Sequence, residues 1–114
     1  MQRQLLVVTC AISAGIHAAL VPQHLEEGLG AGLGFLAAAL LLAVVTGAIV
    51  WDVGRAAIGA AAVLGGLLAV YLPATTTGLP LLHPEPEPVT ALALATKAIE
   101  AVGVLSALSL KGTP

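Results

Sequence analysis

Residues 28–51, with the sequence GLGAGLGFLAAALLLAVVTGAIVW, form the apolar stretch that decides the fold of this chain. An α-helix rises about 1.5 Å per residue, so roughly 20 residues cross the hydrocarbon core of a bilayer, which is about 30 Å thick. Lipid offers no hydrogen-bond partners to backbone N–H and C=O groups, so such a stretch must be helical. It therefore predicts a membrane-spanning helix.

Three further apolar stretches predict three more spans, at 5–21, 56–73 and 89–110. The second and third spans are separated only by the short turn Asp52–Arg55, which forces them to be antiparallel neighbours. We therefore expect one all-α domain over 1–114. It would be an integral membrane bundle of four transmembrane helices, up-down-up-down, with outer loops at 22–27 and 74–88.

The composition supports a surface that faces lipid. Hydrophobic residues make up 59% of the chain and charged residues only 9%, whereas a soluble domain carries about 25% charged residues. The net charge is −2 and the four Lys and Arg residues are scattered, which argues against nucleic-acid binding. The single Cys10 excludes an intramolecular disulfide, and we expect it to pack as a small apolar residue.

The first stretch has an alternative interpretation as a secretory signal peptide, because Arg3 precedes the apolar run from Leu5 to Ile12. The basic region is nearly absent, however, and the apolar character continues beyond any plausible cleavage point. The pattern therefore favours a span.

Pro22 is expected to end or kink the first helix. Its ring nitrogen has no N–H to donate to residue 18, and it disfavours α geometry at Val21. A short interfacial turn over 22–27 should follow. In the other outer loop, prolines at 84, 86 and 88 forbid helix and favour an extended chain.

Charge placement predicts the orientation. Arg3, Arg55 and Lys111 fall on one side of a four-span layout, which is the cytoplasmic side by the positive-inside rule. We therefore expect a cell-membrane protein with both termini cytoplasmic. Trp51 and Tyr71 are expected to anchor span ends at the interface, with Asp52 and Arg55 closing their turn as a pair. The acidic loop residues fall on the outer side: Glu26, Glu27, Glu85 and Glu87.

Histidines gather on the outer side and raise the hypothesis of a metal site formed by His17, His24, Glu27 and His83. Imidazole and carboxylate are good ligands for first-row divalent metals. If the first helix continued through Pro22, the spacing of seven would place Cys10, His17 and His24 on nearly one face. The alternative is that His17 packs between helices and bonds a carbonyl or hydroxyl, while the other two are solvated. No established metal-binding spacing is present.

Lys97 and Glu100 lie three residues apart inside the fourth span and are therefore neighbours on one helix face. Intramembrane charges are costly and usually face a bundle interior or a wet cavity. The pair could lock the helix packing, reaching Thr9, Ser13 or His17. It could also contact a partner subunit, or serve a proton or ion relay.

Glycines open the second span at alternate positions. Two overlapping small-xxx-small pairs result, Gly28 with Gly32 and Gly30 with Gly34, and such pairs let another helix backbone approach closely. General richness in glycine and alanine is the simpler explanation.

Three segments together resemble uncharacterised small bacterial four-helix membrane proteins: 15–27 (GIHAALVPQHLEE), 76–80 (TTGLP) and 87–100 (EPVTALALATKAIE). The resemblance covers most of the chain and implies the four-span layout. It implies no activity. In proteins of this kind the position of Lys97 need not be basic.

We expect a small, non-enzymatic membrane component, either self-associating or accessory to a larger complex, because no catalytic motif is present. Its partners would be the lipid bilayer and a second copy or another membrane protein. The alternatives are a metal-handling membrane protein, and a proton-coupled transporter or channel subunit using Glu100 and Lys97. No cofactor is predicted beyond a transition metal ion in the first alternative.

Overall fold

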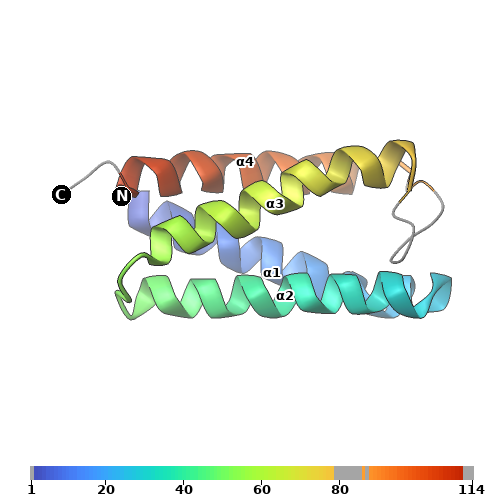
Figure 1. Cartoon of the computed structure of the whole chain (residues 1–114), viewed down its shortest axis with the longest axis horizontal. Coiled ribbons are helices and arrows are strands. Elements are labelled where there is room, and N and C mark those ends of the chain that lie inside the picture. The colour runs from blue at the N-terminus through green and yellow to red at the C-terminus, as the bar shows by residue number, and fades with distance from the viewer. Residues whose placement is uncertain (1, 79–85, 87, 112–114) are drawn as a thin grey trace.

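The computed structural model of the chain describes residues 2–78, 86 and 88–111, and these residues form four α-helices and no strand (Figure 1). The helices are α1 (Gln2–Glu27), α2 (Leu29–Val50), α3 (Ala56–Thr76) and α4 (Ala91–Lys111). Each is long and apolar enough to cross a membrane. The all-helical fold class with four candidate spans is confirmed.

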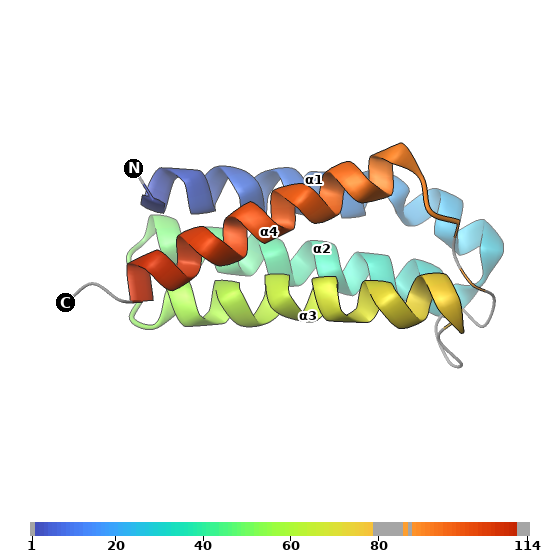
Figure 2. The same cartoon turned by 90° about the horizontal axis from the view of Figure 1, so that it is seen from above.

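Consecutive helices run in opposite directions along a bundle that measures 44 × 22 × 21 Å (Figures 1 and 2). The start of α1, the α2–α3 turn and the end of α4 lie together at one end, which we call the Arg3 end. The α1–α2 connection lies at the opposite end, which we call the Glu27 end. The two views agree that α1 packs beside both α2 and α4, and that α3 packs beside α4.

The first helix does not end at Pro22, so the predicted loop over 22–27 was wrong. Helix α1 continues to Glu27, and Gly28 alone joins it to α2 in an extended conformation (φ 167°, ψ 152°). A proline inside a helix costs about 3 kcal/mol. Packing of the last turn of α1 on α2 offsets that cost, since the His24 ring stacks on Phe35 with centroids 3.7 Å apart.

The remaining boundaries shift by a few residues. The 28–51 and 89–110 spans become Leu29–Val50 and Ala91–Lys111, and α3 continues to Thr76, so the second outer loop begins later than residue 74. Most of that loop lies outside the described residues.

Gly32 and Gly103 allow helices to approach closely, and of these Gly32 belongs to the predicted set. A Cβ on Gly32 would overlap the Leu25 side chain and come within 2.9 Å of the Leu25 Cα, so Gly32 serves the α1–α2 hairpin. A Cβ on Gly103 of α4 would lie 2.7 Å from Leu64 Cδ1 and 2.8 Å from Thr9 Oγ1. Gly103 therefore sets the approach of α4 to both α1 and α3, which the sequence did not indicate.

A buried apolar cluster fills the half of the bundle nearest the Arg3 end. It includes Cys10, which confirms that this residue packs as a small apolar side chain. All four helices contribute to the cluster, whose buried members are Leu6, Cys10, Leu42, Ile49, Ala60, Leu64 and Ala107.

Arg3 joins α1 to the end of α2. Its Nη2 donates to the carbonyl oxygens of Ile49 at 2.8 Å and Val50 at 3.1 Å at the C-terminus of α2, where the Ile49 oxygen also accepts from the Asp52 N–H at 3.1 Å. Asp52 pairs with Arg3, at 3.9 Å, and not with Arg55 as expected. Asp52 and Arg55 both have positive φ, 56° and 66°, because the chain must reverse within this short turn. The backbone conformation thus directs the two side chains differently from the predicted turn-closing pair.

Candidate functional site

The buried polar and charged side chains of the described residues come from only two helices, α1 and α4. We call this set the α1–α4 seam. No buried polar residue of the seam comes from α2 or α3, although the hydroxyl atom of the half-buried Tyr71 on α3 is itself buried. A polar side chain away from water must be paired to be tolerated, so a concentration along one helix pair marks the part of the bundle where chemistry is possible. Its members are Thr9, Ser13, His17 and His24 on α1, and Thr96, Glu100 and Ser106 on α4.

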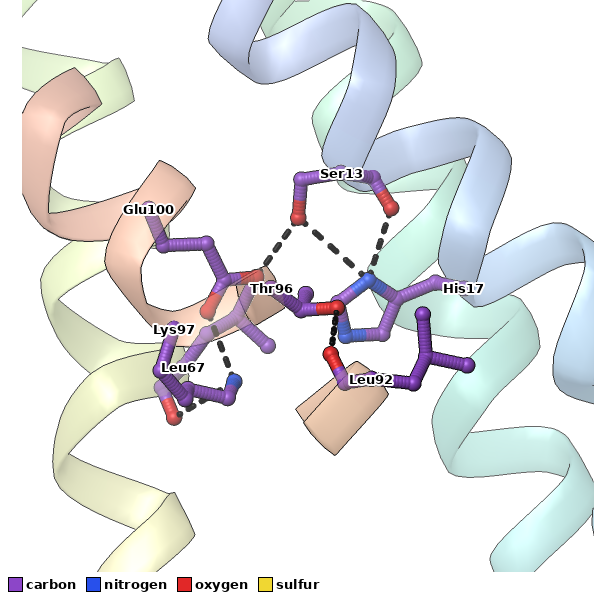
Figure 3. Close-up of polar contacts among 7 residues, drawn as sticks. All are labelled: Ser13, His17, Leu67, Leu92, Thr96, Lys97 and Glu100. Atoms are coloured by element: carbon purple, nitrogen blue, oxygen red, sulfur yellow. Dashed lines mark hydrogen bonds and ion pairs between the residues drawn. The ribbon is translucent and has the colours of Figure 1, made fainter. Parts of the chain in front are cut away.

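Glu100 lies at the centre of the seam and is fully buried, with 0% of the residue exposed. Its Oε1 accepts a hydrogen bond from Lys97 Nζ at 2.6 Å, and its Oε2 accepts one from Ser13 Oγ at 2.5 Å (Figure 3). The predicted neighbourhood of Lys97 and Glu100 on one helix face is confirmed. The carboxylate points into the bundle and is held by donors from α1 and α4.

Lys97 reaches from Glu100 towards α3. Its Nζ also lies 3.5 Å from the Leu67 carbonyl oxygen and 5.4 Å from the centroid of the Tyr71 ring. The ammonium group is therefore held by an anion, a carbonyl and an aromatic face, each of which favours its charge. Its side chain is 18% exposed, so it forms the outer edge of the charged pair.

Tyr71 does not reach out as the interfacial anchor that we expected. Its ring lies by Lys97, and its hydroxyl is buried without a hydrogen-bond partner within the described part of the chain. The reason is its position on the bundle-facing side of α3, one turn after Leu67, where the Lys97 side chain crosses between the helices. Trp51, by contrast, is 80% exposed at the Arg3 end, as an interfacial residue would be.

His17 extends the polar contacts beyond the ion pair. Its Nδ1 lies 2.8 Å from the Ser13 carbonyl oxygen and 3.4 Å from Ser13 Oγ (Figure 3). A carbonyl oxygen can only accept, so Nδ1 carries a proton and donates it. Because Ser13 Oγ donates to Glu100, it is an acceptor towards His17. The order of contacts is therefore His17, Ser13, Glu100, Lys97.

His24 lies on the same face of α1, two turns beyond His17. Its Nδ1 donates to the Leu20 carbonyl oxygen at 2.9 Å. The Phe35 ring of α2 stacks on His24 and also contacts His17, with centroids 5.4 Å apart. Because α1 continues past Pro22, Cys10, His17 and His24 all fall on the buried face, as the spacing of seven predicts for an unbroken helix.

The predicted metal-ligand set is not assembled by the residues that the structure describes. Over residues 2–78, 86 and 88–111, no group of three or more His, Cys, Asp or Glu side chains is arranged to hold a metal ion. Glu27 is exposed at the Glu27 end. His83 lies outside the described residues, so the set His17, His24, Glu27 and His83 stays a prediction.

Sequence reasoning found the charged pair but gave Ser13 only a place among several candidate contacts. Ser13 lies three residues after Cys10 and four before His17, the spacing of one helical face, and that signal was available. Phe35 and Gly103 carried no comparable signal. Their importance follows from which helices become neighbours.

The charge balance of the seam is local. Glu100 and Lys97 neutralise one another, and the remaining polar side chains of the seam are hydroxyls and imidazoles whose Nδ1 atoms lie within hydrogen-bond distance of backbone carbonyls. A buried pair with this many additional hydrogen bonds meets the condition under which its attraction can offset desolvation.

No protein-family model, curated protein or solved structure matches this chain.

Proposed function

We propose that the protein is a small, non-enzymatic, multi-pass membrane component that self-associates through α3. The observation that carries the proposal is the outward face of α3. A smaller share of α3 is buried in the bundle than of any other helix. Its outward face carries a stripe of small residues at helical spacing, flanked by the exposed side chains of Ile58, Val70 and Leu72. The stripe is Gly59, Ala62, Gly66 and Ala69.

This face is separate from the one that α3 uses within the chain. Helix α3 packs into the bundle through Ala60, Leu64 and Ala74, with Leu67 and Tyr71 on the same side. At about 100° per residue, the small-residue stripe lies on the far side of the helix from these positions. A Cβ added at Gly59 or Gly66 would meet no atom within 4 Å. The stripe is therefore open to another helix.

Close approach is the main source of helix association in lipid. Hydrocarbon tails are as apolar as leucine, so a hydrophobic surface gains little by leaving them, whereas small residues let two backbones come into van der Waals contact. The α3 face carries no charge, and a partner must therefore be equally small and uncharged. A second copy of α3 meets that requirement in a two-fold arrangement, in which the same patch is used on both subunits.

The glycines at the start of α2, which the sequence suggested for helix–helix contact, are only partly available for contact with a second chain. Gly32 is occupied by Leu25 of its own chain, while Gly28 has no atom within 4 Å of an added Cβ. Gly30 and Gly34 are half-buried. The α2 glycines therefore serve the α1–α2 hairpin at Gly32, and α3 is the better candidate for an intermolecular contact.

The test is the oligomeric state of the purified protein in lipid, with Gly66→Leu compared to Gly15→Leu. Both glycines lie within a helix and have open space around an added Cβ, but Gly15 is on α1. Single-molecule photobleaching in liposomes at increasing protein density should show wild-type dimers. We expect Gly66→Leu to weaken the dimer at least about tenfold, which is about 1.4 kcal/mol. Gly15→Leu should behave as wild type. A wild-type protein that stays monomeric at all densities, or equal effects of both variants, contradicts the proposal.

The proposed location is the cell membrane, with both termini on the cytoplasmic side. Arg3 and Arg55 lie at one end of the bundle, and Glu26 and Glu27 lie at the other, which supports this orientation by the positive-inside rule. In a Cys10→Ala background, a cysteine at the exposed Gln2 should react with an impermeant thiol reagent only after cells are opened. A cysteine replacing Glu26 should react in intact cells. The reverse pattern would show the opposite orientation.

Metal handling is a second candidate, supported by the geometry of the two seam histidines. His17 and His24 each donate their Nδ1–H to the backbone carbonyl four residues earlier, which is the support that metal-binding imidazoles commonly have. Elemental analysis of the purified protein should then find near-stoichiometric metal, and none in a His17→Ala/His24→Ala variant. Metal-free wild-type protein, purified after growth with metals present, would refute this candidate.

A further inference from the structure

The contacts around Glu100 form a chain of groups that can pass a proton. His17 Nδ1 lies 2.8 Å from the Ser13 carbonyl oxygen and 3.4 Å from Ser13 Oγ, so its proton is shared between these two acceptors, and Ser13 Oγ donates to Glu100 Oε2 at 2.5 Å. Each group in this chain donates to the next, so the polarity is consistent from the imidazole to the carboxylate. We infer that Glu100 is a reversible proton acceptor, loaded from the Glu27 end of the bundle through His17 and Ser13, with Lys97 as its charge-balancing partner.

The seam is polar on one side of Glu100 and closed on the other. Towards the Glu27 end it continues through Ser13 and His17 to His24, all on the buried face of α1. Towards the Arg3 end the core is sealed by the fully buried Leu6, Leu42 and Leu64, with Ala107 beside them. Ser106 and Thr9 lie on that side, but their hydroxyls donate to carbonyls of their own helices. Glu100 therefore exchanges its proton only with the Glu27 end of the bundle. This arrangement protonates Glu100 without forming a continuous proton path across the bundle.

The ligand of this site is a proton and not a metal cation. Both carboxylate oxygens of Glu100 face donors, namely the ammonium of Lys97 at 2.6 Å and the hydroxyl of Ser13. A metal cation binding there would meet the Lys97 charge at contact distance, where like charges repel strongly in a medium of low dielectric constant. A proton adds one positive charge to the carboxylate without needing a coordination shell.

The groups that face Glu100 from each helix are compatible with its changing charge. Helix α1 contributes Cys10 and His17 and α4 contributes Lys97, while Tyr71 and the Leu67 carbonyl of α3 contact Lys97. Helix α2 has no titratable residue between Leu29 and Val50. When Glu100 is neutral, the Lys97 ammonium still has the Leu67 carbonyl and the Tyr71 ring to interact with. The protonated state therefore does not leave Lys97 without stabilising contacts.

The transfer is a pair of hops that moves one proton and no electrons. The Ser13 Oγ–H bond breaks as its proton forms a bond to Glu100 Oε2, and the proton of His17 Nδ1 replaces it on Ser13. A proton arriving from the Glu27 end bonds to His17 Nε2 and keeps the imidazole neutral. Glu100 ends as a carboxylic acid, and Ser13 keeps one hydroxyl proton. His17 now carries its proton on Nε2, so its Nδ1 accepts from Ser13 Oγ and has given up its hydrogen bond to the Ser13 carbonyl. Return of the proton by the same steps restores the starting state.

The test is infrared difference spectroscopy of the protein in lipid bilayers, between alkaline and acidic buffer. Wild type should gain a protonated-carboxyl C=O band that is absent from Glu100→Gln, in addition to bands from exposed glutamates that both share. After a rapid drop in pH, this Glu100 band should appear at least about tenfold more slowly in Ser13→Ala than in wild type. Ser106→Ala is the matched control, because Ser106 is also buried in the seam but donates only to the Val102 carbonyl.

Ser13→Thr keeps a hydroxyl at the same position and should restore the wild-type rate, which separates loss of the relay from a general packing effect. The readout is made on the single chain and does not depend on self-association, so Gly66→Leu should show the wild-type band and rate. Identical wild-type and Glu100→Gln spectra overturn the proposal. It is equally overturned if Ser13→Ala and Ser106→Ala load Glu100 at the same rate, or if Ser13→Thr fails to restore it.

Discussion

Replacing Lys97 by methionine should destabilise the bundle through Glu100 rather than through the loss of Lys97 itself. Methionine keeps an unbranched apolar stem beside Tyr71, so packing changes little. The carboxylate of Glu100, with 0% of the residue exposed, would then keep only the Ser13 hydrogen bond. Removing one partner of a buried ion pair costs about 3–5 kcal/mol. Because the Lys97 side chain is 18% exposed, we expect the low end, about 3 kcal/mol.

A double-mutant cycle isolates that effect. Glu100→Gln keeps the size of the side chain and removes its charge, so the additional loss caused by Lys97→Met should be much smaller in the Glu100→Gln background than in wild type. We expect a coupling free energy of about 2 kcal/mol or more between the two positions.

The measurement is reversible unfolding in mixed micelles with increasing SDS, followed by circular dichroism. Wild type, the two single variants and the double variant complete the cycle. Equal costs of Lys97→Met in both backgrounds would refute the reasoning, because they would show that Lys97 stabilises the fold without reference to the Glu100 charge.

Three further changes test the packing under the same unfolding assay. Gly103→Ala should cost about 1–3 kcal/mol of unfolding free energy, because its Cβ would lie 2.7 Å from Leu64 Cδ1. Gly66→Ala should be neutral or stabilising by up to about 1 kcal/mol, because its Cβ would meet no atom within 4 Å and alanine is the better helix former. Equal effects of the two substitutions would contradict the close packing of α4 at Gly103. Tyr71→Phe removes a buried hydroxyl that has no partner within the described residues and should stabilise the bundle by about 1 kcal/mol, and a loss of stability would reveal a partner for that hydroxyl. Arg3→Met should cost about 1–2 kcal/mol, because two carbonyls at the end of α2 lose a charged donor, and an unchanged midpoint would show that the contact is not maintained in lipid.

Pro22 shows why the helix boundaries could not all be predicted. A proline removes one hydrogen bond and crowds the preceding turn, and these local effects favour a break. This local cost does not include the stabilisation from tertiary contacts that the following helical turn makes. Here His24 stacks on Phe35 and Leu25 covers Gly32, contacts that exist only because α2 folds back along α1. The sequence predicts the cost of a proline inside the helix, whereas the contacts that offset this cost can be identified only from the tertiary structure.

The contacts of the candidate site were also predictable only in part. The Lys97–Glu100 contact was predictable, since residues three apart in a helix are neighbours whatever surrounds them. The Ser13–Glu100 hydrogen bond joins residues 87 positions apart. No periodicity within either helix specifies that α1 and α4 are adjacent, so the sequence could suggest a contact between His17, Ser13 and Glu100 but could not specify it.

The sequence by itself determined that the chain forms four helices long and apolar enough to cross a membrane, because helix length and hydropathy depend only on local composition. It also determined that a lysine and a glutamate share one face of the fourth helix. Only the tertiary structure decided that α1 runs unbroken to Glu27, that Gly32 and Gly103 are contact points, and that Glu100 points at Ser13. Those features depend on which helices become neighbours, and that choice follows from the packing of side chains far apart in the chain.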